Sequence, residues 1–519
     1  MATFRPVEQH LGPLAASVPA RAGALAPALA RIWDHDHTVF QDDPTEVADR
    51  LGWLDCPTRF AGRVGQLATF AEQVAAADLT HAVVVGMGGS SLFPEVLAFS
   101  FGGQPGWLEV LVMDSTAPGA LRRLDREVPL HRALYVISSK SGTTVETRCQ
   151  LDFLWSELHA QLGDAAGSRF VAVTDPGSEL AEIGRERGFR AVFENPPEIG
   201  GRFSALSYFG LVPASLLGID IGALLTSARE ASDACRTPDA DSNPALQLAA
   251  FLAAAHDAGR DKLTLLLPEQ IASFGDWVEQ LVAESTGKHG VGLLPVVGES
   301  DPADPAVYGD DRVFVAIGER PGLDQLARAG HPVLRLDLDE PTDLGAHLFV
   351  WEFATALLGV HLGINPFDQP DVAAAKAATS RVLVEGVPDE EPVHPKELLS
   401  QVEPGDYVAI QAFLDPGLEV VEQLEQVRRL LRDELQVPVT LGIGPRYLHS
   451  TGQYHKGGPP TGVFLQVVED DPDELAIPGR DYGFGTLLRA QAAGDLRALR
   501  DQGLRAGRVP LQDLLDLVP

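Results

Sequence analysis

A short polar segment, Ser139-Lys140-Ser141-Gly142-Thr143-Thr144, carries side chains suited to binding a phosphate group. An apolar run at residues 133–137 precedes it and predicts a β-strand, and helical spacing begins at residue 145. Backbone N–H groups at a helix start have no partner within the helix and carry partial positive charge, so they favour an anion. Ordinary capping needs one hydroxyl, whereas this segment has four and a lysine. We therefore expect a phosphate-binding loop.

A second loop, Gly86-Met87-Gly88-Gly89-Ser90-Ser91, follows the β-branched run at residues 82–85. It lacks the third glycine of the dinucleotide-binding fingerprint, and no lysine follows as in a P-loop. Its glycines would let the backbone approach a sugar phosphate closely. A tight turn between a strand and a helix explains them equally well.

Arg202 and Glu284 are charged residues that could act on a bound substrate. Two glycines precede Arg202, which suits a turn that delivers a guanidinium into a site, although a surface loop would also fit. Glu284 falls in a predicted helix at residues 274–285, four residues after Gln280 and on the same face. A single helix glutamate is usually solvated, so its role depends on its surroundings.

Composition limits the class of partner. The chain has 519 residues, 40 basic and 73 acidic, with a net charge of −33. The basic patches that nucleic acids and anionic membranes require are therefore not expected. Cys56, Cys149 and Cys235 are far apart and predict neither a disulfide framework nor a CxxC metal site. With neither a signal-like stretch nor an apolar run of membrane-spanning length, we expect a cytoplasmic protein.

The elements that must position these residues alternate between strand and helix. The first unit has predicted strands at residues 82–85, 108–113, 133–137, 170–173 and 191–193. This alternation predicts a parallel sheet covered on both faces, with ligands beyond the carboxyl ends of the strands. Both polar loops fall at such ends. A second α/β unit begins near residue 244, and the apolar helix at residues 344–362 should be buried.

A third α/β unit follows a linker rich in Pro and acidic residues at residues 386–395. Its long polar loop contains His449 and His455 and is expected to be functional. No third ligand is nearby, so no metal is implied there. We divide the chain into a helical lead-in, two main domains and a C-terminal extension, at residues 1–55, 56–235, 236–385 and 396–519.

Five motifs together resemble the glucose-6-phosphate isomerase family, in the family's order over roughly residues 50–385. They are Gly86-Met87-Gly88-Gly89-Ser90, residues 139–147, Gly200-Gly201-Arg202-Phe203-Ser204, residues 280–288, and Phe367-Asp368-Gln369 with Lys376. The resemblance implies two sugar-isomerase (SIS) domains, each an αβα sandwich. The third unit resembles the extension of isomerases that occur fused to a transaldolase, but no transaldolase barrel is evident.

The resemblance also implies a reversible isomerisation of glucose 6-phosphate and fructose 6-phosphate through a cis-enediol, in glycolysis and gluconeogenesis. It implies that no metal or cofactor takes part. Glu284 would be the base and Arg202 would stabilise the enediolate, while Lys376 would assist ring opening. The substrate-binding residues would be Ser90, Ser139, Lys140, Ser141, Thr144, Glu146, Gln280 and Gln369.

One departure from the family concerns the histidine that opens the sugar ring. The family places it soon after the Glu284 segment, but residues 299–308 contain no histidine. His449 or His455 could take over this role, from the same chain or from a neighbouring subunit. The family's shared sites imply a homodimer.

Two alternatives remain open. A phosphoglucose/phosphomannose isomerase of dual specificity would use the same motifs. A non-catalytic SIS sensor of sugar phosphates would explain the missing histidine, although such a sensor needs no base.

Overall fold

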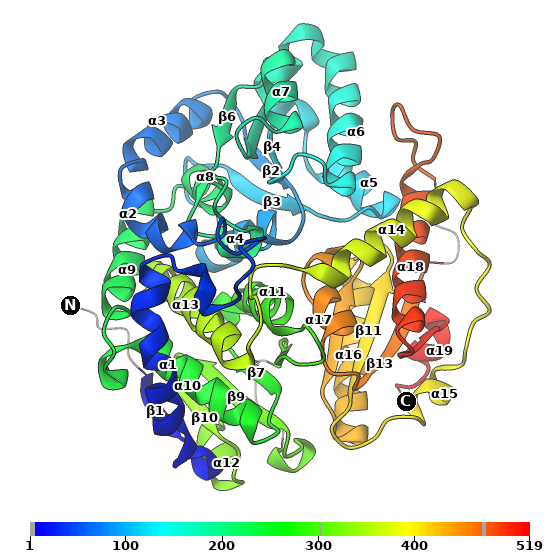
Figure 1. Ribbon diagram of the computed structural model, residues 1–519. Helices are drawn as coiled ribbons and strands as arrows, with labels where there is room; N and C mark the ends of the chain where they lie inside the picture. The colour runs from blue at the N-terminus through cyan, green and yellow to red at the C-terminus, as the bar shows by residue number, and fades with distance from the viewer. Residues whose placement is uncertain (1–5, 300–303, 470–473, 519) are drawn as a thin grey trace.

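The computed structural model describes residues 6–299, 304–469 and 474–518. Its strands form three sheets, as Figure 1 shows. The first sheet, at the top of the view, has the order β3-β2-β4-β5-β6 and is parallel throughout. Its strands are β2 (His81–Val85), β3 (Glu109–Met113), β4 (Ala133–Ser138), β5 (Phe170–Thr174) and β6 (Ala191–Glu194).

The second sheet has the order β1-β10-β9-β7-β8, and only its edge strand β1 runs antiparallel. Its strands are β1 (Pro6–His10), β7 (Lys262–Leu266), β8 (Leu294–Val296), β9 (Arg312–Ile317) and β10 (Val333–Leu336). The first two units contain the helices α1 (Ser17–Trp33), α2 (Cys56–Ala61), α3 (Val64–Ala75), α4 (Leu92–Phe101), α5 (Pro118–Glu127), α6 (Val145–Leu162), α7 (Glu179–Glu186), α8 (Tyr208–Leu217), α9 (Ile221–Ala234), α10 (Pro244–Asp257), α11 (Phe274–Thr286), α12 (Leu323–Arg328), α13 (Leu344–Leu362) and α14 (Pro370–Glu385).

The third sheet is parallel, with the order β12-β11-β13-β14. Its strands are β11 (Tyr407–Phe413), β12 (Val439–Ile443), β13 (Gly462–Val468) and β14 (Arg505–Arg508). The helices of this unit are α15 (Pro395–Leu399), α16 (Leu418–Leu435), α17 (Gly452–Gly457), α18 (Phe484–Asp501) and α19 (Leu511–Leu515). The predicted α/β class with parallel sheets is confirmed.

The expected helical lead-in at residues 1–55 contains α1, as its spacing predicted, but it also contains strand β1. Residues 6–10 pair with β10, whose partner residues lie more than three hundred positions away in the sequence. Such a pairing adds backbone hydrogen bonds at a sheet edge and leaves no local periodicity that a sequence reading could detect. The predicted domain boundaries themselves stay a prediction.

Helix α13 is buried, as its all-round apolar sequence predicted. Residues 341–362 are long and apolar enough to cross a membrane by composition alone, but 89% of the most apolar window is buried inside the fold. The helix packs against α9, α10 and α11. It is therefore the core helix that joins the main units.

Helix α14 lies along α18 of the third unit, and Figure 1 shows the two helices side by side. Gly494 allows this packing, because a Cβ atom at this position would lie 2.7 Å from the backbone nitrogen of Thr379. The third unit is thus attached to the main units through an intimate helix contact rather than through the linker alone.

Candidate active site

Glu284 and Arg202 form the centre of the site. Glu284 lies in the last turn of α11, and Arg202 lies in a 3₁₀ turn at Gly201–Phe203. Their Oε1 and Nη1 atoms are 3.3 Å apart, and their side chains are 12% and 4% exposed. Because so little water reaches the pair, its charges interact more strongly than a surface pair would.

The guanidinium of Arg202 is fixed by hydrogen bonds on every side. Its Nε donates to Ser285 Oγ at 2.8 Å, and its Nη2 donates to the carbonyls of Pro366 and Asp368 at 2.7 and 2.9 Å. Its Nη1 donates to Gln369 Oε1 at 2.9 Å. Burial lowers the pKa of Arg202, and the charge of Glu284 partly offsets that effect. A guanidinium stays charged in proteins, so Arg202 is a fixed cation beside the carboxylate.

Gln280 connects Glu284 to the third unit. Its Nε2 donates to Glu284 Oε2 at 3.2 Å and to the carbonyl of His449 at 2.8 Å. Its Oε1 is buried and has no hydrogen-bond partner among the described residues. An unpaired buried acceptor is costly unless a ligand or water satisfies it, so Oε1 suits a substrate hydroxyl.

The glycine loop before α4 owes its composition to close packing. A Cβ atom on Gly89 would lie 2.0 Å from the carbonyl oxygen of Gly201, and one on Gly88 would lie 2.8 Å from the carbonyl oxygen of His449. Glycine is therefore required for the loop to fit between the Arg202 turn and the third unit. Ser90 ends a 3₁₀ turn in this loop and is half-buried.

The hydroxyl-rich segment lies between β4 and α6, as predicted. Ser139 Oγ lies 3.1 Å from Thr144 Oγ1, and Ser141 Oγ lies 2.9 Å from Thr143 Oγ1. Thr144 occupies the N-cap of α6, yet its side chain makes no capping hydrogen bond. The hydroxyls are therefore clustered at a helix N-terminus without capping it, which is an arrangement suited to an anion.

Lys140 is directed elsewhere. Its Nζ lies 2.5 Å from Asp175 Oδ2 and 2.7 Å from the carbonyl oxygen of Pro197. Asp175 directly follows β5, the neighbour of β4 in the sheet, and this adjacency is why it reaches the lysine. The charge of Lys140 is thus matched by a carboxylate rather than held free for a phosphate.

His449 enters the site from the third unit. Its Nε2 lies 2.9 Å from Oε1 of Glu146, which also accepts a hydrogen bond from Gln491 Nε2 at 2.7 Å. Burial alone would raise the pKa of Glu146, but His449 and, more weakly, Lys376 hold that pKa below its ordinary value. The carboxylate is therefore ionised. Lys376 itself is exposed on α14.

Arg446 and Gln453, on either side of His449 in the sequence, hold this part of the third unit against the main units. Arg446 forms a bidentate pair with Glu95 at 2.6 and 2.7 Å and also donates to Asp114 at 2.7 Å. Gln453 donates to the carbonyl of Gly287, just after α11, at 3.0 Å. The third unit is thus bonded to both main units around the site.

His455, in contrast, lies inside the third unit. Its Nδ1 is 2.9 Å from the hydroxyl of Tyr407, and its ring packs against those of Tyr407 and Phe464. Burial lowers its pKa to about 3, so the imidazole is neutral. The expectation that His455 could serve the site is wrong, because the apolar core of the third unit encloses its ring.

Lys288 is a site residue to which the sequence reading gave no role. Its side chain is fully buried, and its Nζ lies 2.5 Å from the carbonyl oxygen of Asn365 and 2.7 Å from Asp368 Oδ1. Burial and the nearby Arg202 lower its pKa to about 7. Lys288 thus holds the segment whose carbonyls bind Arg202. Its position two residues after the helix end gave no signal of this contact.

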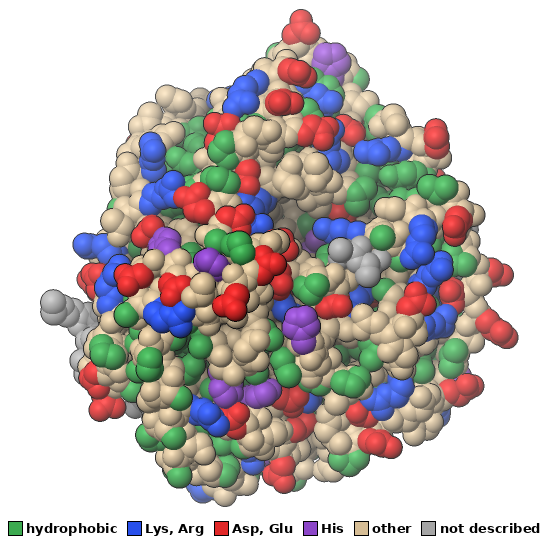
Figure 2. Space-filling model, in the orientation of Figure 1, with side chains coloured by type: hydrophobic (Ala, Val, Ile, Leu, Met, Phe, Trp, Pro, Cys, Tyr) green, Lys and Arg blue, Asp and Glu red, His purple; other side chains and the backbone are tan. Residues whose placement is uncertain are grey.

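Figure 2 shows a hollow near the middle of the face where the three units meet, with basic and histidine side chains at its edge. The two SIS-like units, with a buried carboxylate–guanidinium pair and a hydroxyl-lined helix N-terminus, define a sugar-isomerase architecture. The chain belongs to the phosphoglucose isomerase family. The model of that family, described as phosphoglucose isomerase, matches residues 59–299.

Curated relatives agree with this assignment, and solved structures share the fold. A glucose-6-phosphate isomerase from Thermosynechococcus vestitus is 29% identical over 71% of this chain and 78% of its own length. Another from Synechococcus sp. (strain JA-3-3Ab) is 32% identical over 59% of this chain and 66% of its own length. A hypothetical protein from Thermus thermophilus is 26% identical with a TM-score of 0.62, covering 72% of this chain and 98% of its own. A glucose-6-phosphate isomerase from Chlamydia trachomatis, 21% identical with a TM-score of 0.60 over 71% of this chain and 86% of its own, shares the fold.

Proposed function

We propose that the protein interconverts glucose 6-phosphate and fructose 6-phosphate. The observation that carries the proposal is the buried contact of 3.3 Å between Glu284 and Arg202. Membership of the phosphoglucose isomerase family and the names of the relatives support the choice of substrate.

Glu284 would act as the base that moves one proton. In the open-chain aldose it takes the proton from C2, which lies next to the C1 carbonyl, and the electrons form the C1–C2 double bond of the enediol. The ketose forms when the carbon-bound proton returns to C1, the C1 oxygen gains a proton to become a hydroxyl, and the C2 hydroxyl loses its proton as C2 becomes the carbonyl. A single positioned carboxylate serves both directions.

Arg202 would stabilise the negative charge that forms on oxygen in the enediolate. Its guanidinium is already held by four acceptors, so it need not reorganise during the reaction. Loss of one such donor in other enzymes lowers kcat by about 10²–10³. The hydroxyls of Ser139, Ser141 and Thr144 would hold the phosphate, which fixes the reacting carbons at Glu284.

The test is conversion of fructose 6-phosphate, followed with a coupled dehydrogenase in the presence of EDTA, for wild type and Glu284→Gln. We expect the wild type to be active and Glu284→Gln to be about 10²–10⁴-fold less active. Glutamine keeps the shape of the side chain but cannot act as a base. The control is Glu72→Gln, which changes an exposed glutamate on α3. Glu95→Gln is unsuitable as a control, because Glu95 forms an ion pair with Arg446. An inactive wild type that still binds fructose 6-phosphate would contradict the proposal and favour a sensor.

We further propose a cytoplasmic homodimer. Three buried free cysteines, Cys56, Cys149 and Cys235, are compatible with a reducing compartment. The family resemblance is the support for a dimer. Light scattering of the purified protein tests the oligomeric state, and a monomer at micromolar concentration would contradict it.

A further inference from the structure

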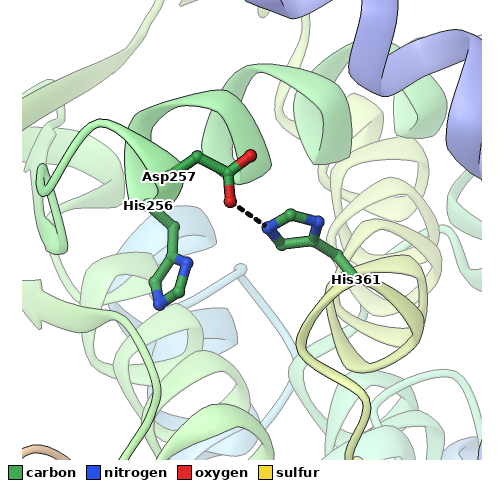
Figure 3. Close-up of side chains that lie close together, drawn as sticks. All are labelled: His256, Asp257 and His361. Atoms are coloured by element: carbon green, nitrogen blue, oxygen red, sulfur yellow. Dashed lines mark ion pairs between the residues drawn. The ribbon is translucent and has the colours of Figure 1, made fainter.

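Three potential metal ligands meet at the ends of two helices, on the second unit. His256 and Asp257 are the last two residues of α10, and His361 lies in the last turn of α13. Figure 3 shows the three side chains directed into one gap between the helices. Their ligand atoms all lie within 4.8 Å of one another.

One pair of these atoms already has the spacing of two ligands on one ion. Asp257 Oδ1 and His361 Nε2 are 3.2 Å apart. Metal–ligand bonds of about 2.0–2.1 Å in a tetrahedral zinc site place neighbouring ligand atoms about 3.3 Å apart. The rings of His256 and His361 have centroids 5.8 Å apart at an angle of 88°. Small side-chain rotations therefore suffice to bring His256 to the same ion.

His256 gives a second and independent indication. Its Nδ1 is buried and has no hydrogen-bond partner among the residues that the structure describes. Figure 3 shows one ring nitrogen of His256 on the side of His361 and Asp257. A buried ring nitrogen without a partner loses the hydrogen bond it would have with water, and a metal ion would supply the missing interaction.

The electrostatic surroundings also favour a cation. The C-terminal ends of α10 and α13 both carry partial negative charge from their unpaired carbonyls. Arg21 competes for the same carboxylate, because its Nε contacts Asp257 Oδ2. The side chains of Arg21 and Asp257 are 41% and 32% exposed, so this is a weak surface ion pair. The other carboxylate oxygen, Oδ1 of Asp257, lies on the side of His361.

We propose that His256, Asp257 and His361 bind one divalent transition-metal ion, with Zn²⁺ as the expected metal and water as the fourth ligand. Two imidazoles and one carboxylate are ligands that suit Zn²⁺. This site is separate from Glu284 and Arg202 and does not depend on the proposed reaction.

The position of His361 suggests what the ion would do. A segment important to the active site begins four residues later, at Asn365. The carbonyls of Asn365 and Pro366 accept hydrogen bonds from Lys288 and Arg202, respectively. A metal ion that joins the ends of α10 and α13 would fix the start of this segment. Its role would be structural, and isomerisation would continue without it.

The test is titration of the EDTA-treated, desalted full-length protein with Zn²⁺ by calorimetry, and with Co²⁺ by visible absorption. We expect one equivalent to bind, with affinity reduced at least tenfold in His256→Asn and in His361→Asn. The control is His35→Asn, which removes another partly exposed histidine lying near a carboxylate, Asp55, outside the site. This control should bind as wild type does. Arg21→Gln should tighten binding, because it frees the second carboxylate oxygen.

Thermal unfolding separates loss of binding from loss of folding. Bound Zn²⁺ should raise the melting temperature of the wild type but not of His361→Asn, while the two metal-free proteins should melt at similar temperatures. Absence of stoichiometric binding by the wild type would overturn the proposal. Binding that persists unchanged in both histidine variants would show an adventitious ion only.

Discussion

His449 Nε2 lies 2.9 Å from Oε1 of Glu146, although 303 positions separate the two residues in the sequence. The contact joins the third unit to the N-terminus of α6. Because the carboxylate is ionised, it can only accept a hydrogen bond from Nε2 of His449, and this contact fixes the orientation of the imidazole ring. The chain thus places an imidazole of its own third unit beside α6 of the first unit.

Replacement of His449 by Ala should lower kcat/KM for glucose 6-phosphate by about 10²–10⁴-fold, the usual range for a lost acid–base group. If the histidine opens the ring, exchange between substrate anomers, measured by NMR at equilibrium, should slow as well. Glu146→Gln should shift the pH profile, since it removes the partner that fixes the imidazole. Unchanged anomer exchange in His449→Ala would rule out this role.

Buried His455 should make the protein less stable in mild acid. Its pKa is about 3 in the folded protein, against about 6.5 when unfolded. Between these values the unfolded chain binds one proton more, so the free energy of unfolding falls as pH decreases, by up to about 1.4 kcal/mol per unit. The contribution of His455 to the free energy of unfolding is therefore fully present above a pH of about 6.5 and decreases below it.

Urea unfolding at pH 7.0 and 5.5 measures this dependence. His455→Asn keeps a polar group toward Tyr407 and removes the titration, so its stability should decrease less between the two pH values than that of the wild type. An identical decrease in both proteins would show that other groups cause the acid sensitivity.

Gly89→Ala should impair activity more than stability. The added Cβ atom would lie 2.0 Å from the carbonyl oxygen of Gly201, so the Arg202 turn must shift. A displacement of this kind near the reacting groups can cost about 10²-fold in rate. Gly65→Ala is the matched control, because it lies in α3 with open space around the new atom. It should retain full activity and the stability of the wild type, because Gly65 lies at the start of the helix and the new methyl group meets no neighbour. Equal activity in the two variants would contradict the expected displacement.

The sequence predicted those features of the site that depend on local pattern. The hydroxyl-rich loop could be placed because an apolar strand ends immediately before it, and the pairing of Gln280 with Glu284 follows from helical spacing. The partner of Lys140 could not be predicted, since Asp175 is brought to it by strand order in the sheet. The contact between Glu146 and Gln491 likewise depends on how the third unit docks.

The distinction between His449 and His455 shows the same limit. Both lie in one polar loop sequence, so residue type gave no way to choose between them. The loop instead folds into a 3₁₀ turn at Arg446–His449 and the helix α17, which direct the first histidine to Glu146 and the second into the core. Tertiary packing, rather than composition, decides which of them lies beside Glu146 and which lies in the core of the third unit.

Specific activity should not depend on protein concentration. Glu284 contacts Arg202, and Gln280 joins Glu284 to the backbone carbonyl of His449, so these contacts around the base form within one chain. If a dimer forms, its dissociation should leave the activity per chain within about twofold, unless the monomer itself unfolds. Assays between nanomolar and micromolar enzyme, with light scattering at matched concentrations, measure this. A loss of activity that follows dissociation, while circular dichroism shows the fold intact, would mean that a partner subunit completes the site.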